Sequence, residues 1–472
     1  MYDPRSRIAA EFIDDAEILA TIEYARAHKE DRALIAEILE KARKMNGLSH
    51  REALVLLESE DEEVWREIFS LAREIKERIY GRRIVMFAPL YLSNYCVNGC
   101  TYCPYHMKNT NIKRKKLSQE EIRREVIALQ DMGHKRLALE AGEHPEYSPI
   151  EYILESIETI YSIRHKNGEI RRVNVNIAAT TVENYKKLHD AGIGTYILFQ
   201  ETYHKPTYEK LHPTGPKHDY AYHTEAMDRA MEAGIDDVGI GVLFGLYEYR
   251  YDFVGLLMHA EHLEETFGVG PHTISVPRIR PADDIDVNEF HDAIEDALFK
   301  KIVALIRIVA PYAGIIISTR ESQRSREEVL EIGVSQISGG SSTSVGGYVE
   351  KESAEESSAQ FDVDDTRTLD EIINWLLTLG YVPSFCTACY REGRTGDRFM
   401  RLAKSGQIGN VCQPNSLMTL KEYLLDYATA DTKEKGEKVI VEEMERIANE
   451  KVRSKAQEYV DQLEGGKRDF RF

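Results

Sequence analysis

The sequence predicts an α/β fold built on a closed barrel of eight parallel strands, with a helical extension before it and a mainly helical domain after it. Two observations support this prediction. From about residue 83 onward, short apolar segments alternate with helical patterns, an order typical of parallel strands joined by helices. Eight such segments are present, and that number favours a closed barrel over an open doubly wound sheet.

The first 80 residues form the predicted N-terminal extension, residues 1–80. Apolar residues recur at helical spacing through Ile18, Ile22 and Ala25, and again through Leu54 and Leu57. Spacing of three and four residues places such side chains on one face of a helix. We therefore expect a set of amphipathic helices that precedes the barrel.

The predicted barrel occupies residues 81–345 and is a (β/α)8 barrel of the TIM type. Its eight strands are rich in branched and aromatic residues. They are expected at residues 84–90, 136–140, 173–178, 195–200, 237–243, 272–277, 314–319 and 334–338.

The remaining residues, 346–472, are expected to form a mainly helical C-terminal domain, which contains the second of two cysteine triplets described below. A small-residue segment at 339–348 and an acidic segment at 350–365 mark the boundary. Helices are expected near 368–379 and 416–428, followed by a charged helical tail at 432–463.

Composition excludes several classes of function. The formal net charge is −19, which works against binding of nucleic acid, and no apolar run approaches the roughly 20 residues of a membrane span. The N-terminus lacks the features of a signal peptide, so a cytoplasmic location is expected, with no nucleic acid and no membrane as partners. The basic run 113–116 is interpreted as a solvated loop before a capping box at 118–121.

Six cysteines fall into two triplets, and a reducing cytoplasm favours metal-binding or catalytic roles for them. Cys96, Cys100 and Cys103 follow the first strand, at the carboxyl end of the barrel where active sites form. Three thiolates can hold three irons of a cubane cluster and leave the fourth open. A zinc site is the alternative, but structural zinc usually has paired CxxC knuckles, which this triplet lacks.

The arrangement CxxxCx(aromatic)C at 96–103 resembles the signature of radical S-adenosylmethionine (radical SAM) enzymes. That resemblance implies a 4Fe–4S cluster whose open iron is chelated by S-adenosylmethionine, which is cleaved to a 5′-deoxyadenosyl radical. It also implies cofactor contacts for Tyr102 beside adenine and for Gly142 and Glu143 beside the methionine amino group. The remaining cofactor-binding residues that it implies are Glu201, Gly241 and Val242.

Segments at 199–203, 277–281, 318–321 and 340–344 resemble the aromatic amino acid lyase branch of that superfamily. The branch contains 2-iminoacetate synthase of thiamine biosynthesis and the tyrosine lyase that matures FeFe-hydrogenase. The spacing CxxC-x22-C of Cys386, Cys389 and Cys412 resembles the maturase type. It implies a second 4Fe–4S cluster with an additional iron, to which His272 is a candidate ligand.

The residues alone leave alternatives for this second triplet. Residues 386–412 contain no histidine, which makes zinc a poorer fit than a cluster. Buried free thiols remain an alternative, because cysteine is commonly buried. His272 opens strand six, so it is expected at the amino-terminal end of the barrel, opposite the first triplet; a lone His on a strand is otherwise more often a core residue.

The resemblance implies a specific reaction: L-tyrosine is cleaved at its Cα–Cβ bond to p-cresol and dehydroglycine, and dehydroglycine then yields carbon monoxide and cyanide at the second cluster. It further implies L-cysteine as a cofactor, a hydrogenase maturation scaffold protein as partner, and an electron donor such as ferredoxin or flavodoxin. Candidate groups for the tyrosine carboxylate are Arg278, Arg320 and Ser338, at strand ends.

Two other functions are compatible with the sequence. A 2-iminoacetate synthase would stop at dehydroglycine and release no carbon monoxide. A non-catalytic iron–sulfur carrier would need no barrel whose strand ends carry polar residues suited to a substrate.

Overall fold

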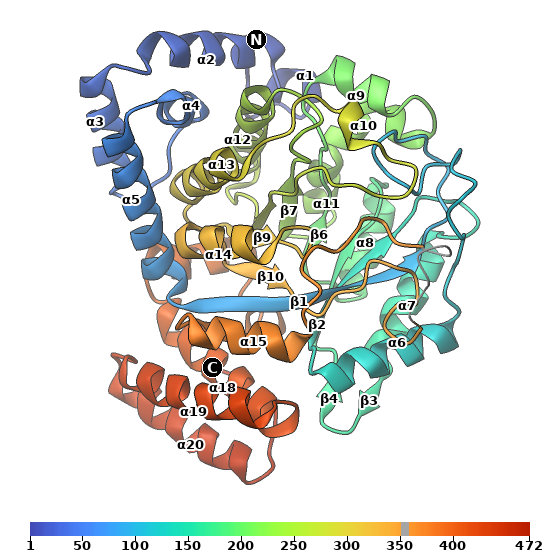
Figure 1. Cartoon of the computed structure of the whole chain (residues 1–472), viewed down its shortest axis with the longest axis vertical. Coiled ribbons are helices and arrows are strands. Elements are labelled where there is room, and N and C mark those ends of the chain that lie inside the picture. The colour runs from blue at the N-terminus through green and yellow to red at the C-terminus, as the bar shows by residue number, and fades with distance from the viewer. Residues whose placement is uncertain (351–357) are drawn as a thin grey trace.

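The computed structural model of the chain describes residues 1–350 and 358–472. Eight parallel strands close into a barrel because β1 pairs with β2 on one side and with β10 on the other. This confirms the predicted closed barrel (Figure 1). The barrel strands are β1 (Arg83–Ser93), β2 (Arg136–Ala141), β5 (Arg172–Asn176), β6 (Tyr196–Ile197), β7 (Val238–Gly241), β8 (Thr273–Ser275), β9 (Gly314–Ile317) and β10 (Gln336–Ser338).

Three observed strands lie outside the eight predicted segments. β3 (Arg164–His165) and β4 (Gly168–Glu169) form a short hairpin. β11 (Val382–Ser384) joins the amino-terminal end of β1 in parallel, with Arg83 opposite Val382. Its central Pro383 is tolerated because β11 is an edge strand with one pairing neighbour.

Helices cover the outside of the barrel between successive strands. They begin at typical signals: Ser118 and Glu121 form a capping box at the start of α6, as predicted. The barrel helices are α6 (Gln119–Met132), α7 (Ile150–Ser162), α8 (Val182–Asp190), α9 (Lys205–Leu211), α10 (Tyr220–Thr224), α11 (Ala226–Glu232), α12 (Tyr249–Phe267), α13 (Asp296–Val309) and α14 (Gln323–Ile332), with 3-10 turns η1 (Pro216–His218) and η2 (Val287–Glu289).

The N-terminal helices form the expected extension along one side of the barrel (Figure 1). Each of the longer ones begins at an Asp or Ser that accepts a hydrogen bond from the first turn, such as Asp61 at α5. Trp65, Ile68 and Leu71 bury the apolar face of α5, which packs against α13. The helices are α1 (Ala9–Phe12), α2 (Asp15–His28), α3 (Arg32–Ala42), α4 (His50–Glu58) and α5 (Glu62–Tyr80).

The C-terminal part is mainly helical, and α18, α19 and α20 lie at one end of the molecule (Figure 1). The predicted tail is two helices, α19 and α20. The elements are α15 (Leu369–Thr378), α16 (Ala388–Arg391), α17 (Gly396–Lys404), α18 (Gly409–Asp426), α19 (Ala430–Glu445) and α20 (Glu450–Glu464). The domain boundary between residues 345 and 346 stays a prediction, and part of the acidic segment expected there, 351–357, lies outside the described residues.

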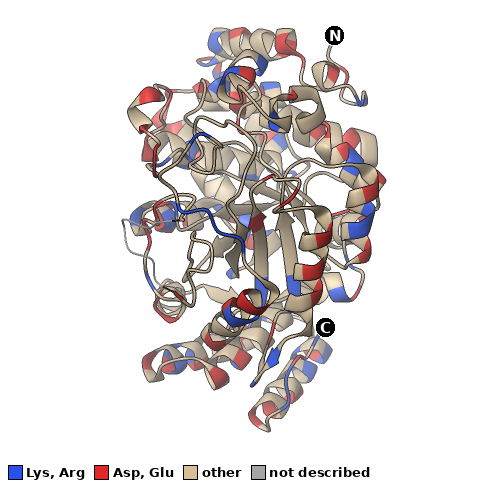
Figure 2. Cartoon of the chain, turned by 90° about the vertical axis from the view of Figure 1, so that its right-hand side faces the viewer, with Lys and Arg blue, Asp and Glu red and all other residues tan. Residues whose placement is uncertain are grey.

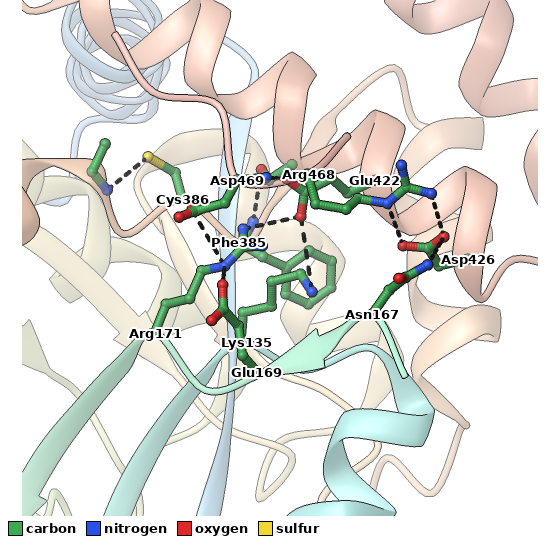
Figure 3. A network of polar contacts seen from close by, with 12 residues as sticks. Lys135, Asn167, Glu169, Arg171, Phe385, Cys386, Glu422, Asp426, Arg468 and Asp469 are labelled. Atoms are coloured by element: carbon green, nitrogen blue, oxygen red, sulfur yellow. Dashed lines mark hydrogen bonds and ion pairs between the residues drawn. The ribbon is translucent and has the colours of Figure 1, made fainter. Parts of the chain in front are cut away.

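A buried network of ion pairs connects α18 to the amino-terminal end of the barrel (Figure 3). Arg171 Nη1 lies 2.9 Å from Glu422 Oε2 of α18, and Arg171 Nε lies 2.7 Å from Glu169 Oε1 of β4. Lys135 Nζ lies 3.8 Å from the same Glu422 carboxylate. Because these charges are buried and paired, losing one partner would leave an uncompensated charge, so the network fixes α18 against the barrel.

Among the described residues, no helix is long and apolar enough to cross a membrane. Figure 2 shows that acidic and basic positions are both spread along the outer helices.

Candidate active site

The first cysteine triplet lies in the loop after β1, at the carboxyl end of the barrel. Cys96, Cys100 and Cys103 line one cavity of about 160 Å³. The cavity is also lined by Glu140 and Ala141 at the end of β2, by Gly142 and Glu143 just after it, and by Phe199 after β6. The sequence therefore placed the triplet correctly, at the end where barrel active sites form.

Two glycines allow the cysteine loop to approach its neighbours. Gly99 donates its N–H to Thr214 O over 3.0 Å, and a Cβ there would overlap the Thr214 hydroxyl. A Cβ on Gly142 would overlap the carbonyl oxygen of Tyr95 and would lie 3.2 Å from Cys96 Cβ. At Gly142 the atoms in the way belong to the backbone of Tyr95, so glycine is needed there, whereas at Gly99 they belong to the side chains of Thr214 and Pro213.

The thiols of this loop occupy a site that penalises their charged form. Burial raises the pKa of Cys100 well above its usual value and that of Cys103 to about 12. A buried thiolate is stable only beside compensating positive charge, and iron ions provide it. Three thiols that share one cavity therefore fit three irons of a cubane cluster. Among the described residues, no group of three or more His, Cys, Asp or Glu side chains could bind a single metal ion.

Two carboxylates of the cavity are held by polar neighbours. Asn98 Nδ2 donates to Glu143 Oε2 over 2.6 Å and lies 3.7 Å from Cys96 Sγ. Lys217 Nζ donates to Glu201 Oε1 over 2.7 Å, and this partner helps to raise the pKa of the lysine despite its burial. Glu201 itself has a positive φ of 71°, a strained conformation that is often found at functional sites.

The other predicted cofactor residues lie in or beside the same cavity. Tyr102 lines it, and the Tyr102 hydroxyl lies 2.7 Å from His212 Nε2. Gly142 also lines the cavity. Gly241 and Val242 are not lining residues, but Val242 forms a β-bridge with Glu201, which does line the cavity. A Cβ on Gly241 would lie 2.7 Å from the Phe199 ring, so this glycine lets a lining aromatic side chain sit close to β7.

A second cavity of about 100 Å³ continues from the first into the barrel. The two share Glu140, Asn176, Phe199 and Arg320 as lining residues. Ser338 also lines the deeper cavity, and its Oγ accepts the Thr319 N–H over 3.1 Å. Two of the three predicted carboxylate-binding residues, Arg320 and Ser338, are therefore brought together.

Arg278 lies outside both cavities. Its guanidinium forms an ion pair with Glu321 and another, at 2.8 Å, with Asp296. Because these carboxylates already occupy it, Arg278 is placed to hold the segment around Glu321 rather than to contact a ligand.

The second cysteine triplet lies at the opposite, amino-terminal end of the barrel. Cys386 follows β11, Cys389 is on α16 and Cys412 is on the first turn of α18. Cys389 and Cys412 belong to one apolar cluster with Phe399. Arg136, the first residue of β2, donates to the Cys386 carbonyl over 3.0 Å, which ties this site to the base of the barrel.

Positive charges surround the second triplet. A hydrogen bond from the Cys389 thiol, with help from Arg83 and Arg394, lowers the pKa of Cys412. Burial raises the pKa of Cys386, an effect that Arg83 and Arg136 oppose. An anionic group such as a thiolate-ligated cluster therefore fits this site electrostatically.

His272 lies beside the second triplet and not beside the first. Its Nε2 is 2.6 Å from the hydroxyl of Tyr390, the residue after Cys389, and its ring packs edge-on against Phe399 at 5.1 Å between centroids. Its Nδ1 is 3.6 Å from Asp237 Oδ1. The structure thus places His272 at the amino-terminal end of the barrel, near the C-terminal cysteines, where it was expected.

Comparison with known proteins identifies the family. The profile described as Radical SAM superfamily matches residues 90–259, and that described as Biotin and Thiamin Synthesis associated domain matches residues 275–382. A crystal structure of HydG, a maturase of the [FeFe]-hydrogenase, aligns with a TM-score of 0.95 and 58% identity, over 98% of this chain and 100% of that one. The chain belongs to the HydG family of hydrogenase maturases.

Two further relatives place this HydG family member within the superfamily. HydG from Carboxydothermus hydrogenoformans aligns with a TM-score of 0.82 and 39% identity, over 96% of this chain and 100% of its own. The 2-iminoacetate synthase of Salmonella typhimurium (strain LT2) is 30% identical over 346 residues, which are 73% of this chain and 89% of that protein. Membership in the radical SAM superfamily implies S-adenosylmethionine and a 4Fe–4S cluster.

Sequence reasoning missed several residues of the HydG-type site. Glu140 interrupts the apolar strand β2, and burial raises its pKa well above the usual range. Burial of a carboxyl group in a strand costs free energy unless the group has a polar partner. The position of Glu140 in an apolar strand could therefore have predicted that it lines the site. Lys217 and Asn98 gave no comparable signal in the sequence. The loop at 212–217 is distant in sequence from the cysteine loop, and the two come into contact only in the folded structure, where Lys217 N donates to Asn98 Oδ1.

Proposed function

We propose that this chain is a radical SAM tyrosine lyase that cleaves the Cα–Cβ bond of L-tyrosine and converts dehydroglycine into carbon monoxide and cyanide for hydrogenase maturation. The observation that carries the proposal is the pair of cysteine triplets at opposite ends of one barrel, with a ligand-sized cavity extending inward from the first. Membership in the HydG family supports it.

At the first site, Cys96, Cys100 and Cys103 would hold the 4Fe–4S cluster. When bound, the cluster and S-adenosylmethionine supply a 5′-deoxyadenosyl radical as the hydrogen-abstracting species. Glu143, held by Asn98, and Glu201, held by Lys217, present carboxylates suited to the methionine ammonium and the ribose hydroxyls. Tyr102 provides an aromatic face for adenine.

The deeper cavity is proposed to receive L-tyrosine. Arg320 lines both cavities, and a guanidinium can bind the tyrosine carboxylate through two parallel hydrogen bonds. Ser338 supports this segment through its bond to Thr319 N. Glu140 has a raised pKa, so its protonated carboxyl group can donate a hydrogen bond to the substrate instead of repelling the carboxylate.

At the second site, Cys386, Cys389 and Cys412 would hold the auxiliary 4Fe–4S cluster, and His272 its additional iron. Ligation through His272 Nε2 requires the Tyr390 hydroxyl to give way, because the two atoms are hydrogen bonded. L-cysteine is the proposed further cofactor here. Arg83, Arg136 and Arg394 provide the positive environment in which anionic sulfur and cyanide would be stabilised.

The partners proposed with this function are an electron donor such as ferredoxin or flavodoxin, and the scaffold protein of hydrogenase maturation. A cytoplasmic location is proposed with them, since the clusters require a reducing compartment.

One anaerobic experiment tests the proposal. The reconstituted protein is incubated with L-tyrosine, S-adenosylmethionine and dithionite, and p-cresol, carbon monoxide and cyanide are quantified. All three products are expected from the wild type. Formation of p-cresol without carbon monoxide would identify a 2-iminoacetate synthase, and absence of S-adenosylmethionine cleavage would refute a radical SAM activity.

A further inference from the structure

The basic run at 113–116 contains one residue that belongs to the first cysteine loop. The sequence interpretation treated the whole run as solvated, and Lys113 is indeed exposed. Arg114 is different because it is half-buried and reaches back to the loop that carries the cysteines. The interpretation was wrong for this residue.

The guanidinium of Arg114 donates to four backbone carbonyls. Nη1 bonds to Asn94 O at 2.6 Å and to Tyr105 O at 2.9 Å, while Nη2 bonds to His106 O at 2.7 Å and to Asn109 O at 3.2 Å. The two terminal nitrogens carry four N–H groups in a planar fork. Each of these N–H groups therefore has one carbonyl partner.

The bonded carbonyls lie on both sides of the cysteine triplet. Asn94 precedes Cys96 by two residues, and Tyr105 and His106 follow Cys103 by two and three. One side chain thus joins the two ends of the segment that spans all three thiols. The neighbouring backbone adds to this closure, since Lys115 N donates to Asn94 Oδ1 over 2.8 Å.

The bonds of Nη1 to Asn94 O and Tyr105 O hold the positive charge of the guanidinium at backbone positions two residues from Cys96 and two residues from Cys103. Its pKa is lowered by burial, while Cys96 and Cys103 act in the opposite direction through their charges. With an ordinary pKa above 12, an arginine stays charged under such conditions. The charge of an iron–sulfur site and of its surroundings is one of the determinants of its reduction potential.

We propose that Arg114 is a positioning residue of the first cluster site, which closes the cysteine loop through its four carbonyl bonds and raises the reduction potential of the cluster through its charge. The proposal rests on the assignment of a cluster to Cys96, Cys100 and Cys103. It concerns retention and potential of the cluster, and not the choice of substrate.

Two substitutions separate the two effects. Arg114→Gln removes the charge and cannot make four bonds, so it should shift the midpoint potential to a more negative value and release iron to a chelator at least tenfold faster than the wild type. Arg114→Lys keeps the charge but has one compact ammonium group. It should release iron at an intermediate rate with a midpoint potential close to that of the wild type.

The experiment uses the reconstituted full chain. Iron release to a chelator is followed anaerobically, and the potential is measured from the S-adenosylmethionine-sensitive spectrum, which reports on the first cluster. Lys108→Gln, an exposed lysine of the same loop, is the matched control for loss of one charge and should behave like the wild type.

The outcomes are distinguishable. Iron release from Arg114→Gln at the wild-type rate would overturn the closure of the loop. An equal shift of potential in Arg114→Lys and Arg114→Gln, or an equal shift in Lys108→Gln, would overturn the electrostatic effect. If the wild-type protein held no cluster responsive to S-adenosylmethionine, the proposed function itself would fail, independently of Arg114.

Discussion

Replacement of Gly142 by alanine tests the packing on which the first site depends. A Cβ at this position would overlap Tyr95 O, and would lie 3.0 Å from the Tyr95 carbonyl carbon and 3.2 Å from Cys96 Cβ. Both neighbours are fixed, because Gly142 N donates to Ser93 O over 2.9 Å and Val97 N donates to Glu143 O over 2.8 Å. The added methyl group must therefore displace backbone.

The expected cost follows from this geometry. Overpacking of a rigid site costs about 1–3 kcal/mol, and weakening one of the two backbone hydrogen bonds adds about 1 kcal/mol. We expect the free energy of unfolding of Gly142→Ala to fall by about 2–4 kcal/mol. Because the displaced residue is next to Cys96, cleavage of S-adenosylmethionine should fall by about tenfold or more.

The measurement is urea unfolding of the cluster-free protein, followed by the rate of S-adenosylmethionine cleavage after reconstitution. Gly270→Ala is the control, since the nearest atoms to its Cβ belong to Glu264 and are 3.9 Å and 4.0 Å away. It should stay within about 0.5 kcal/mol of the wild type. An equal stability of Gly142→Ala and Gly270→Ala would refute the reasoning.

Three other predictions address the cysteines and a buried lysine. Cys100→Ala should abolish S-adenosylmethionine cleavage, measured as 5′-deoxyadenosine, and retained cleavage would contradict the cluster assignment. Cys386→Ala and Cys389→Ala should spare p-cresol but remove carbon monoxide; loss of both products from folded protein would contradict separate sites. Burial lowers the pKa of Lys76 from 10.5 to about 7. Between pH 7 and pH 10.5 the unfolded state therefore binds more protons than the folded state, so the stability of the wild type rises with pH. Lys76→Met lacks this group, so its gain in stability over the wild type should shrink as pH rises from 7 towards 10.5. A constant difference in urea midpoint between pH 7 and pH 10 would contradict this sign.

The barrel could be predicted because its strands carry a strong local pattern. All eight predicted segments overlap observed strands, although most of the later strands are shorter than predicted. β6, for example, is limited to Tyr196–Ile197, although Leu198 N and Gln200 N still donate to Gly239 O and Gly241 O before the strained Glu201. Apolar alternation reports burial on a barrel strand, but it does not report where regular pairing stops.

β11 was not predicted because its residues carry no strand pattern of their own. Val382, Pro383 and Ser384 follow a helix and include a residue that cannot donate to a ladder. The strand forms because the amino-terminal end of β1 extends to Arg83 and offers an unpaired edge there. The paired residues are separated by nearly three hundred residues along the chain. Their pairing depends on tertiary structure, which local sequence patterns do not reveal.

The candidate sites divide in the same way. Cysteine spacing identified both triplets, and the strand pattern predicted the end of the barrel at which His272 lies, whereas its association with the second triplet came from the family resemblance. The polar residues that hold the site together, such as Lys217 and Arg114, come from loops that are distant in sequence or that resemble solvated surface. Their roles depend on hydrogen bonds to backbone carbonyls or to a single carboxylate, which leave no periodic signal in the sequence.

The position of β11 also explains how one barrel can carry two sites. Barrel chemistry normally lies at the carboxyl ends of the strands, and the first triplet follows that rule. The second triplet does not come from the barrel loops: Cys386 reaches the opposite end because β11 adds to β1 in parallel and stops beside its first residues. α18, fixed by Glu422 against Arg171, then brings Cys412 to the same end. Since β1 covers 11 residues and a strand rises about 3.3 Å per residue, the two cysteine triplets are separated by a full strand length.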